Sequence, residues 1–328
     1  MSEAPARRVE MLPMLEGLHL AHAAGALEAE GILDDLREPR SAAELARRHG
    51  LDPEILGGTL EYLARRTNLV TKVGAAYAAG EGYDGPARFM LNLYAGAFGP
   101  AASRLRTALR RPSAAGGLVD RKAQARAFER GSGAAPPVAA VVRQLGLDRL
   151  LDLGCGSGIL LSALADETPT FRGWGVDSNP RMVRAARKRL REAGAAARVT
   201  ILEGDCFELA RSVPAAILDE VRTILASQVA NELFRGGGAA FVGWLARLKA
   251  ALPGRILIIS DYYGRLHPEC GEADGFTLLH DFCQLISGQG VPPAGQPEWA
   301  RLYAEAGCDL RAVIDDDSAT RFVHILRT

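Results

Sequence analysis

The segment Leu150–Leu160, which reads LLDLGCGSGIL, decides the fold of this 328-residue chain. Its first four residues are mainly apolar and predict a buried strand, which the glycines at positions 154, 156 and 158 then end. Apolar residues at helical spacing follow the turn, at Leu161, Leu164 and Ala165. A strand, a glycine turn and a helix N-terminus form a cradle for a polar ligand, because glycine lets the backbone approach that ligand closely.

The spacing of the glycines argues against a dinucleotide as the ligand. The dinucleotide fingerprint is G-x-G-x-x-G or G-x-G-x-x-A, whereas this turn is G-x-G-x-G and is followed by Ile159. Asp152 stands just before the turn, where a carboxylate would repel a pyrophosphate and attract a cationic group. The segment therefore favours a zwitterionic nucleoside over NAD.

The next strands of the chain also end in polar residues. Residues 172–177 predict a second strand that ends in Asp177, and residues 199–206 a third that ends in Gly-Asp-Cys. Residues 221–226 and 255–260 predict the fourth and fifth strands. Strands that alternate with helices predict a parallel sheet with helices on both faces. With these motifs, the chain closely resembles the class I S-adenosylmethionine-dependent methyltransferases.

The resemblance implies an α/β fold with a doubly wound, Rossmann-like sheet of seven strands, the last one antiparallel. Residues 310–314 and 321–326 are the expected terminal strand pair. An N-terminal, mainly helical, winged-helix-like domain is expected in front of the sheet. The predicted division is a dimerisation and lid domain at 1–117, a connecting helix and linker at 118–137, and a cofactor-binding catalytic domain at 138–328.

The N-terminal region has the helix signals of a winged helix. Residues 11–30 have helical periodicity, Ser41 opens a capping-box pattern, and Asp52-Pro53 starts a further helix. Residues 68–77 predict a β-hairpin wing. The would-be recognition helix carries arginines only at its C-terminal end, whereas its N-terminal part would face the base edges. We therefore expect a dimer interface and a cover for the active site rather than DNA binding.

Composition sets the remaining bounds. Lys plus Arg and Asp plus Glu number 39 each, so the formal net charge is zero and no broad basic field is expected. This balance argues against nucleic acid as the main partner. The first residues lack the apolar core of a signal peptide, and no apolar run is long enough to span a bilayer. The five cysteines are scattered and form no C-x-x-C pair, so we expect reduced thiols in a cytoplasmic protein without a membrane partner.

The resemblance assigns roles to the residues around the predicted cradle. The three glycines would lie under the methionine part of the cofactor, and Asp152 would attract its ammonium group. Asp177 would accept hydrogen bonds from the ribose hydroxyls, and Asp205 one from the adenine amino group. The predicted cofactor-binding residues are Asp152, Gly154, Gly156, Gly158, Asp177, Ser178, Asp205, Cys206, Phe207, Ser227 and Gln228.

The predicted catalytic residues lie after the fourth and fifth strands. Plant-type O-methyltransferases carry a general-base histidine where this chain has Asn231. A general base typically gives ~10²–10⁴-fold in rate, whereas holding the nucleophile in line can contribute about 7–11 kcal/mol. The change therefore puts the substrate type in question and not the cofactor. Tyr262 could face the sulfonium, and His280 with Asp281 could supply a base, so Asn231, Tyr262, His280 and Asp281 are the catalytic candidates.

Three functions stay open at this point. The first is in-line methyl transfer to an O, N or C nucleophile of a small secondary-metabolite type molecule, by a homodimer with S-adenosylmethionine as co-substrate. The second is cyclisation of S-adenosylmethionine to azetidine-2-carboxylic acid with release of methylthioadenosine. The third is a cofactor-binding transcriptional regulator. His267, His280 and Asp281 could hold a metal, but a lone helical histidine is more often a packed residue, so no metal is expected.

Overall fold

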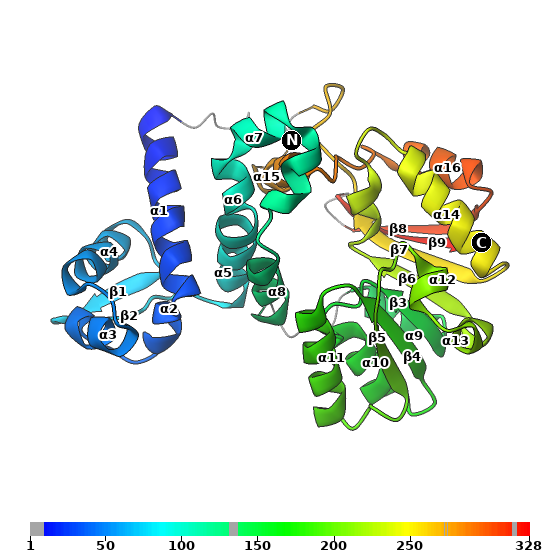
Figure 1. Ribbon diagram of the computed structural model, residues 1–328, viewed down its shortest axis with the longest axis horizontal. Coiled ribbons are helices and arrows are strands. Elements are labelled where there is room, and N and C mark those ends of the chain that lie inside the picture. The colour runs from blue at the N-terminus through cyan, green and yellow to red at the C-terminus, as the bar shows by residue number, and fades with distance from the viewer. Residues whose placement is uncertain (1–9, 131–136, 272, 274, 317–319) are drawn as a thin grey trace. The chain divides into compact units, whose positions relative to one another are not determined.

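The computed structural model describes residues 10–130, 137–271, 273, 275–316 and 320–328. The chain divides into two compact units (Figure 1). The first comprises the residues up to 105 together with 117–132, and the second comprises 106–116 together with the residues from 133 onward. The segment 106–116 thus belongs to the second unit, and the segment 117–132 belongs to the first. The predicted division, with boundaries at 117 and 137, is different. The predicted linker at 131–136 lies outside the described residues.

The first unit starts with helices and a hairpin. Helix caps fix two of the helices: the Ser41 side chain accepts from the Glu44 N–H at 3.2 Å, and Asp52 Oδ1 accepts from the backbone of Glu54 and Ile55. A fully buried core of leucines and Ile32 joins these elements. The elements are α1 Met11–Ala29, α2 Ile32–Asp35, α3 Ala42–His49, α4 Pro53–Arg66, β1 Val70–Val73 and β2 Ala76–Ala79.

The first half of α1 is apolar but exposed. Leu27 near the end of α1 is buried, whereas Leu15 and Leu18 remain 45% and 51% exposed. Met11, Leu12 and Met14 are exposed as well. Helical periodicity does not say what covers such residues.

The rest of the first unit is helical, as predicted, with one irregular helix. Helix η1 is a π-helix, which was not predicted; such segments are rare and often occur at functional sites. Its Asn92 donates to the buried Glu28 carboxylate at 2.8 Å. Phe128 of α8 packs edge to face on Phe89 of α5, with ring centroids 5.7 Å apart. The elements are α5 Gly85–Met90, η1 Leu91–Ala97, α6 Gly99–Ser103 and α8 Arg121–Arg130.

The second unit is built on a seven-stranded sheet with the order β5-β4-β3-β6-β7-β9-β8. Every pairing is parallel except those of β9, which runs antiparallel to both β7 and β8. The predicted sheet with an antiparallel last strand is therefore confirmed. The strands are β3 Arg149–Leu153, β4 Arg172–Asp177, β5 Val199–Glu203, β6 Thr223–Ser227, β7 Ile256–Tyr262, β8 Asp309–Asp315 and β9 Arg321–Arg327.

Helices cover both faces of this sheet (Figure 1). Apolar side chains of α9, α10 and α11 pack on one face, and those of α14 and α16 pack on the other. Trp244, Trp299 and Tyr303 are among the largest side chains buried there. Apart from α8, the helices from residue 105 onward are α7 Leu105–Arg110, η2 Pro112–Leu118, α9 Val138–Gln144, α10 Ile159–Glu167, α11 Pro180–Glu192, α12 Leu209–Ser212, α13 Ala215–Glu220, η3 Ala230–Leu233, α14 Ala239–Ala251, α15 Gly275–Ile286 and α16 Gln296–Glu305.

The strand register brings the polar strand ends to one edge. Leu153, just before the glycine turn, pairs with Val176 of β4 and with Ala226 of β6. Asp177 pairs with Glu203 of β5. Open parallel sheets bind ligands at the carboxyl ends of their strands, near the point where the strand order reverses. In this sheet that point lies between β3 and β6.

Candidate functional site

The three glycines of the turn after β3 all have positive φ, at 69°, 53° and 73°. Other L-residues rarely adopt this backbone conformation. A Cβ on Gly154 would lie 2.6 Å from Val229 Cγ2, and one on Gly158 would lie 3.0 Å from Ala186 Cβ. A Cβ on Gly156 would meet no atom within 4 Å. The turn is therefore closely packed at its two ends and open at its middle glycine, where a ligand could lie against the backbone.

Asp177 ties the second strand to this turn. Its Oδ2 accepts from the Gly156 N–H at 2.9 Å, and its Oδ1 accepts from the Asn179 N–H at 2.8 Å. Burial raises the pKa of the carboxyl, and the two backbone donors oppose that shift. Asp177 thus lies beside the open middle of the turn, and its neighbour Ser178 is exposed.

Asp152 is a buried carboxyl on β3, only 4% exposed. Burial, and secondarily the charge of Asp177, raises its pKa to about 8. No cation contributes to that shift. A buried carboxyl in such a place becomes charged readily only when a cation approaches it, and the predicted ligand ammonium would be such a cation. Asp152, Gly154, Gly156, Gly158 and Asp177 are called the glycine-turn cluster below.

The residues after β5 form their own turn. Asp205 is exposed, its Oδ1 accepts from the Phe207 N–H at 2.8 Å, and its backbone carbonyl accepts from Ser212 Oγ at 2.7 Å. The Phe207 ring meets Trp244 edge to face at 6.0 Å. Burial raises the pKa of the Cys206 thiol to about 12, so the thiol is neutral near pH 7. These three residues border the same edge of the sheet as the glycine-turn cluster.

The end of β6 holds a strained residue. Gln228 has φ = 56° and is the only non-glycine residue with positive φ in the described part of the chain. Its N–H donates to the Ser260 carbonyl of the neighbouring strand at 2.8 Å. Strain of this kind costs of order 1–3 kcal/mol and concentrates at functional sites. The exposed Gln228 and half-buried Ser227 begin the segment that leads to η3.

Asp261, which the sequence analysis did not select, organises the ends of β6 and β7. It is 1% exposed, its Oδ2 accepts from the Asn231 N–H at 3.1 Å, and its Oδ1 accepts from the Tyr262 N–H at 3.0 Å. Burial raises its pKa to about 7. Asp261 directly follows the strand predicted at residues 255–260, and this strand-end position is the signal that could have found it. Its carboxyl brings two catalytic candidates, Asn231 and Tyr262, to one place.

Helix α15 contributes the other two candidates, which have different surroundings. The His280 ring packs edge to face on Tyr262 with centroids 5.0 Å apart, and burial lowers its pKa. Gln284, one turn later, has its Nε2 3.4 Å from His280 Nε2. The Asp281 carboxylate bonds to backbone groups of the loop after β7. Its Oδ2 accepts from the Arg265 and Leu266 N–H groups at 2.5 and 2.8 Å and holds the loop after β7.

The turn after α15 is packed tightly against the end of η3. The Gln289 carbonyl accepts from the Phe234 N–H at 3.1 Å. Gly290 has φ = 90°, and a Cβ there would lie 2.4 Å from the backbone carbon of Phe234. Asn231 and α15 are therefore held on one body. We call Asn231, Asp261, Tyr262, His280, Asp281 and Gln284 the η3–α15 cluster.

The two clusters adjoin, because Gly154 contacts Val229, the residue before η3. Among the residues that the structure describes, no group of three or more His, Cys, Asp and Glu side chains could hold a metal ion. Likewise, no helix of the described part of the chain is both long and apolar enough to cross a membrane.

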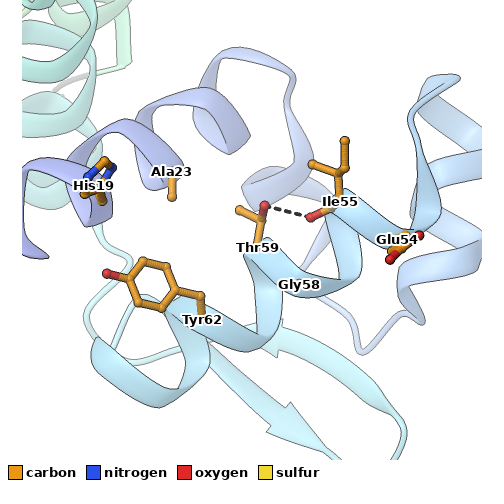
Figure 2. Close-up of a pocket in the computed structure, with 7 residues that line it drawn as sticks. All are labelled: His19, Ala23, Glu54, Ile55, Gly58, Thr59 and Tyr62. Atoms are coloured by element: carbon orange, nitrogen blue, oxygen red, sulfur yellow. Dashed lines mark hydrogen bonds between the residues drawn. The ribbon is translucent and has the colours of Figure 1, made fainter.

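A separate hollow of about 480 Å³ lies in the first unit between α1 and α4 (Figure 2). His19 and Ala23 border it on α1, and Ile55, Thr59 and Tyr62 border it on α4. The Thr59 hydroxyl donates to the Ile55 carbonyl at 2.8 Å, so it is already engaged within its own helix. None of the predicted site residues lies in this hollow.

Comparison with known proteins identifies the segment that contains the glycine turn. Residues 150–233 match the methyltransferase domain family. The segment that contains the glycine turn is therefore similar to a methyltransferase domain. The chain is 34% identical over 122 residues to the ribosomal protein L11 methyltransferase of Gloeobacter violaceus, which is 35% of this chain and 38% of that protein. It is also 34% identical over 100 residues to the trans-aconitate 2-methyltransferase of Streptomyces coelicolor, covering 30% and 31%. The chain thus spans about a third of the curated relatives it matches.

Solved structures match almost the whole chain in fold. The mitomycin 7-O-methyltransferase MmcR superposes with a TM-score of 0.72 at 22% identity over 96% of each chain. PigF with SAH superposes with a TM-score of 0.75 at 20% identity, covering 97% and 98%. The predicted fold is therefore confirmed, and the match of residues 150–233 agrees with the predicted methyltransferase superfamily. The roles of individual site residues stay predictions.

Proposed function

We propose that this protein transfers a methyl group from S-adenosylmethionine to a nucleophile on a small molecule. The open middle of the glycine turn, flanked by Asp152 and Asp177, carries the proposal. A ligand that fits there needs a cationic group for Asp152 and hydroxyl donors for Asp177. The amino acid and the ribose of S-adenosylmethionine supply both.

The residues of the chain divide the binding of that cofactor among them. Asp152 would pair with the ammonium group and become charged as it does so. Asp177 already accepts from two backbone N–H groups, and its lone pairs leave room for ribose hydroxyls. Asp205 and Phe207 would border the adenine. When bound, S-adenosylmethionine supplies a methyl group activated by its sulfonium.

Catalysis in this proposal rests mainly on positioning. The η3–α15 cluster adjoins the glycine turn through Val229 and is held by the Asp261 carboxyl and by the tight turn at Gly290. Burial keeps His280 neutral near pH 7, so one ring nitrogen could accept a proton from the acceptor molecule. In-line placement of the nucleophile can lower the barrier by about 7–11 kcal/mol, more than a general base contributes.

The names of structural relatives support a small-molecule acceptor. One is a mitomycin 7-O-methyltransferase. Another, NcsB1 from neocarzinostatin biosynthesis, was solved with S-adenosyl-L-homocysteine and 1,4-dihydroxy-2-naphthoic acid and superposes with a TM-score of 0.65. We extend the modest size and the hydroxyl groups of such acceptors, and not the carboxyl group, to the present chain.

We also propose that the protein is a homodimer through its first unit. The exposed apolar residues of α1 recur at positions 11, 14, 15 and 18, which is the spacing of one helix face. A stripe of this kind on a soluble domain marks an interaction surface. A second copy would bring an identical stripe, as two-fold symmetric contacts require. Sedimentation equilibrium of the full chain would test this, and a monomer at micromolar concentration would contradict it.

One assay separates the proposed function from the other two. The purified chain is incubated with S-adenosylmethionine, with and without a metabolite extract of small hydroxylated and amino compounds, and the nucleosides are quantified. We expect S-adenosylhomocysteine only when an acceptor is present. Methylthioadenosine without any acceptor would indicate cyclisation. Retained binding of S-adenosylmethionine with no product, together with a DNA mobility shift, would indicate a regulator.

A further inference from the structure

The η3–α15 cluster contains buried oxygens that lack a hydrogen-bond partner. Within the described residues, three buried side-chain carbonyl or carboxylate oxygens have none: Oδ1 of Asn231, Oδ1 of Asp281 and Oε1 of Gln284. Their side chains are buried, with exposed fractions of 3%, 0% and 5%. All three belong to η3 and α15. Native proteins pair nearly all buried polar atoms, so such a concentration calls for an explanation.

The three residues share one region of the fold. Asp281 and Gln284 are three residues apart on α15 and so lie on one helix face, with His280 one turn before Gln284. His280 contacts Tyr262, and the Tyr262 N–H shares the Asp261 carboxyl with the Asn231 N–H. The turn after α15 is packed on Phe234 at the end of η3. The residues that bear the unpaired oxygens therefore lie near the carboxyl ends of β6 and β7, where ligands of open parallel sheets bind.

All three atoms are hydrogen-bond acceptors, and the Tyr262 hydroxyl of the same cluster can both donate and accept. An amide oxygen or a carboxylate oxygen accepts hydrogen bonds and repels another anion. Hydroxyl and amino groups are the complement of such a surface. A carboxylated or phosphorylated molecule would bring further acceptors and negative charge against it.

We propose that the acceptor site selects its substrate by hydrogen-bond donors. Hydroxyl or amino groups of the acceptor are received by the side-chain oxygens of Asn231, Asp281 and Gln284, and carboxylated acceptors are excluded. This inference rests on the proposed function and narrows its substrate class. Gln284 is the position that tests this selection, because its Oε1 accepts no hydrogen bond within the described residues, whereas Asp281 also holds the loop at Arg265.

The first test is the stability of the cofactor-bound protein. Gln284→Met removes the unpaired oxygen and keeps the shape of the side chain, so we expect the melting temperature of the full chain with S-adenosylhomocysteine to rise by about 2–4 °C. Thr223→Val is the matched control. Its hydroxyl is buried and unpaired among the described residues but lies at the start of β6, at the opposite edge of the sheet. A fall in melting temperature for Gln284→Met would overturn the proposal, since it would show that the amide has a structural partner.

The second test is acceptor discrimination. Transfer of labelled methyl groups is measured with 1,3-dihydroxynaphthalene, 3-amino-1-naphthol and 3-hydroxy-1-naphthoate as probes. For the unmodified chain, we expect kcat/KM with each of the first two probes to exceed kcat/KM with the carboxylate at least about tenfold. In Gln284→Met, we expect this ratio to fall about tenfold through a change in KM. Thr223→Val should keep it. Preference for the carboxylate, or an unchanged preference in Gln284→Met, would overturn the proposal. Loss of S-adenosylhomocysteine binding by the unmodified chain would instead refute the proposed function.

Discussion

The glycine-turn cluster and the η3–α15 cluster adjoin each other but are built on opposite principles. The glycine-turn cluster comes from two short stretches, 152–158 and 177–179, and backbone donors already satisfy Asp177. The η3–α15 cluster draws on residues 231, 261–262 and 280–284 and leaves three buried oxygens unpaired. The first is a standard cradle fixed by local backbone conformation. The second depends on tertiary packing and keeps its polar capacity for a ligand. In the proposals made above, cofactor binding therefore belongs to the local motif and acceptor selectivity to the assembled one.

The largest effect that would sharpen this comparison is expected at Gly156. Gly156→Ala strains the positive-φ backbone and places a methyl group in the open middle of the turn. Gly194→Ala is the matched control, because Gly194 also has positive φ (66°) and open space but lies after α11. Both variants should lose about 1–2 kcal/mol of stability. Only Gly156→Ala should lose about tenfold to hundredfold in S-adenosylhomocysteine affinity by calorimetry, and equal affinities in the two variants would contradict the cradle.

A smaller effect is expected at Asp261, on the other side of the comparison. Each carboxylate oxygen of Asp261 accepts a hydrogen bond from a different N–H group. Asp261→Asn therefore keeps one acceptor and places an NH₂ group against the other N–H donor. We expect a loss of about 1–2 kcal/mol of stability and a fall in methyl transfer with unchanged S-adenosylhomocysteine affinity. Asp52→Asn is the control, because a single oxygen of Asp52 receives both of its N–H groups. Weaker S-adenosylhomocysteine binding by Asp261→Asn would contradict the expectation that the η3–α15 cluster affects methyl transfer and not cofactor binding.

The smallest effect is a pH dependence that belongs to Asp152. Its folded pKa, about 8, lies above its ordinary value of 3.8. Its contribution to stability is therefore fully present below pH 3.8 and is lost as the pH rises through about 8. Pairing with an ammonium needs the charged form, so S-adenosylhomocysteine affinity should rise about threefold to tenfold from pH 6 to pH 8.

The control for this pH dependence is Asp152→Asn, which is neutral at every pH. We expect it to bind S-adenosylhomocysteine more weakly and to gain stability relative to the unmodified chain as the pH rises. Thermal melting and calorimetry between pH 5 and pH 9 would measure both. An affinity for Asp152→Asn that matched the unmodified chain at each pH would show that Asp152 does not face the ammonium.

Sequence alone predicted the parts of the molecule that local rules determine. β4 was predicted with the bounds that it has, because an apolar run ending in an acid is a complete signal. The position of Asp177 beside Gly156 follows from parallel register. The role of Asp261 did not emerge, since it depends on N–H groups 30 residues away and one residue away. The exposure of the apolar face of α1 was not predicted, because periodicity does not report the partner that a helix face meets. The π-helix η1 was not predicted either.

The contact between Gly290 and Phe234 has a consequence for how this chain could acquire a new substrate. No side chain fits between them, so a substitution that shifts α15 also shifts the segment that bears Asn231. Directed evolution of acceptor preference is therefore expected to proceed through paired changes, one on α15 and one between residues 229 and 235. A single change on either segment would leave the other segment poorly matched to it.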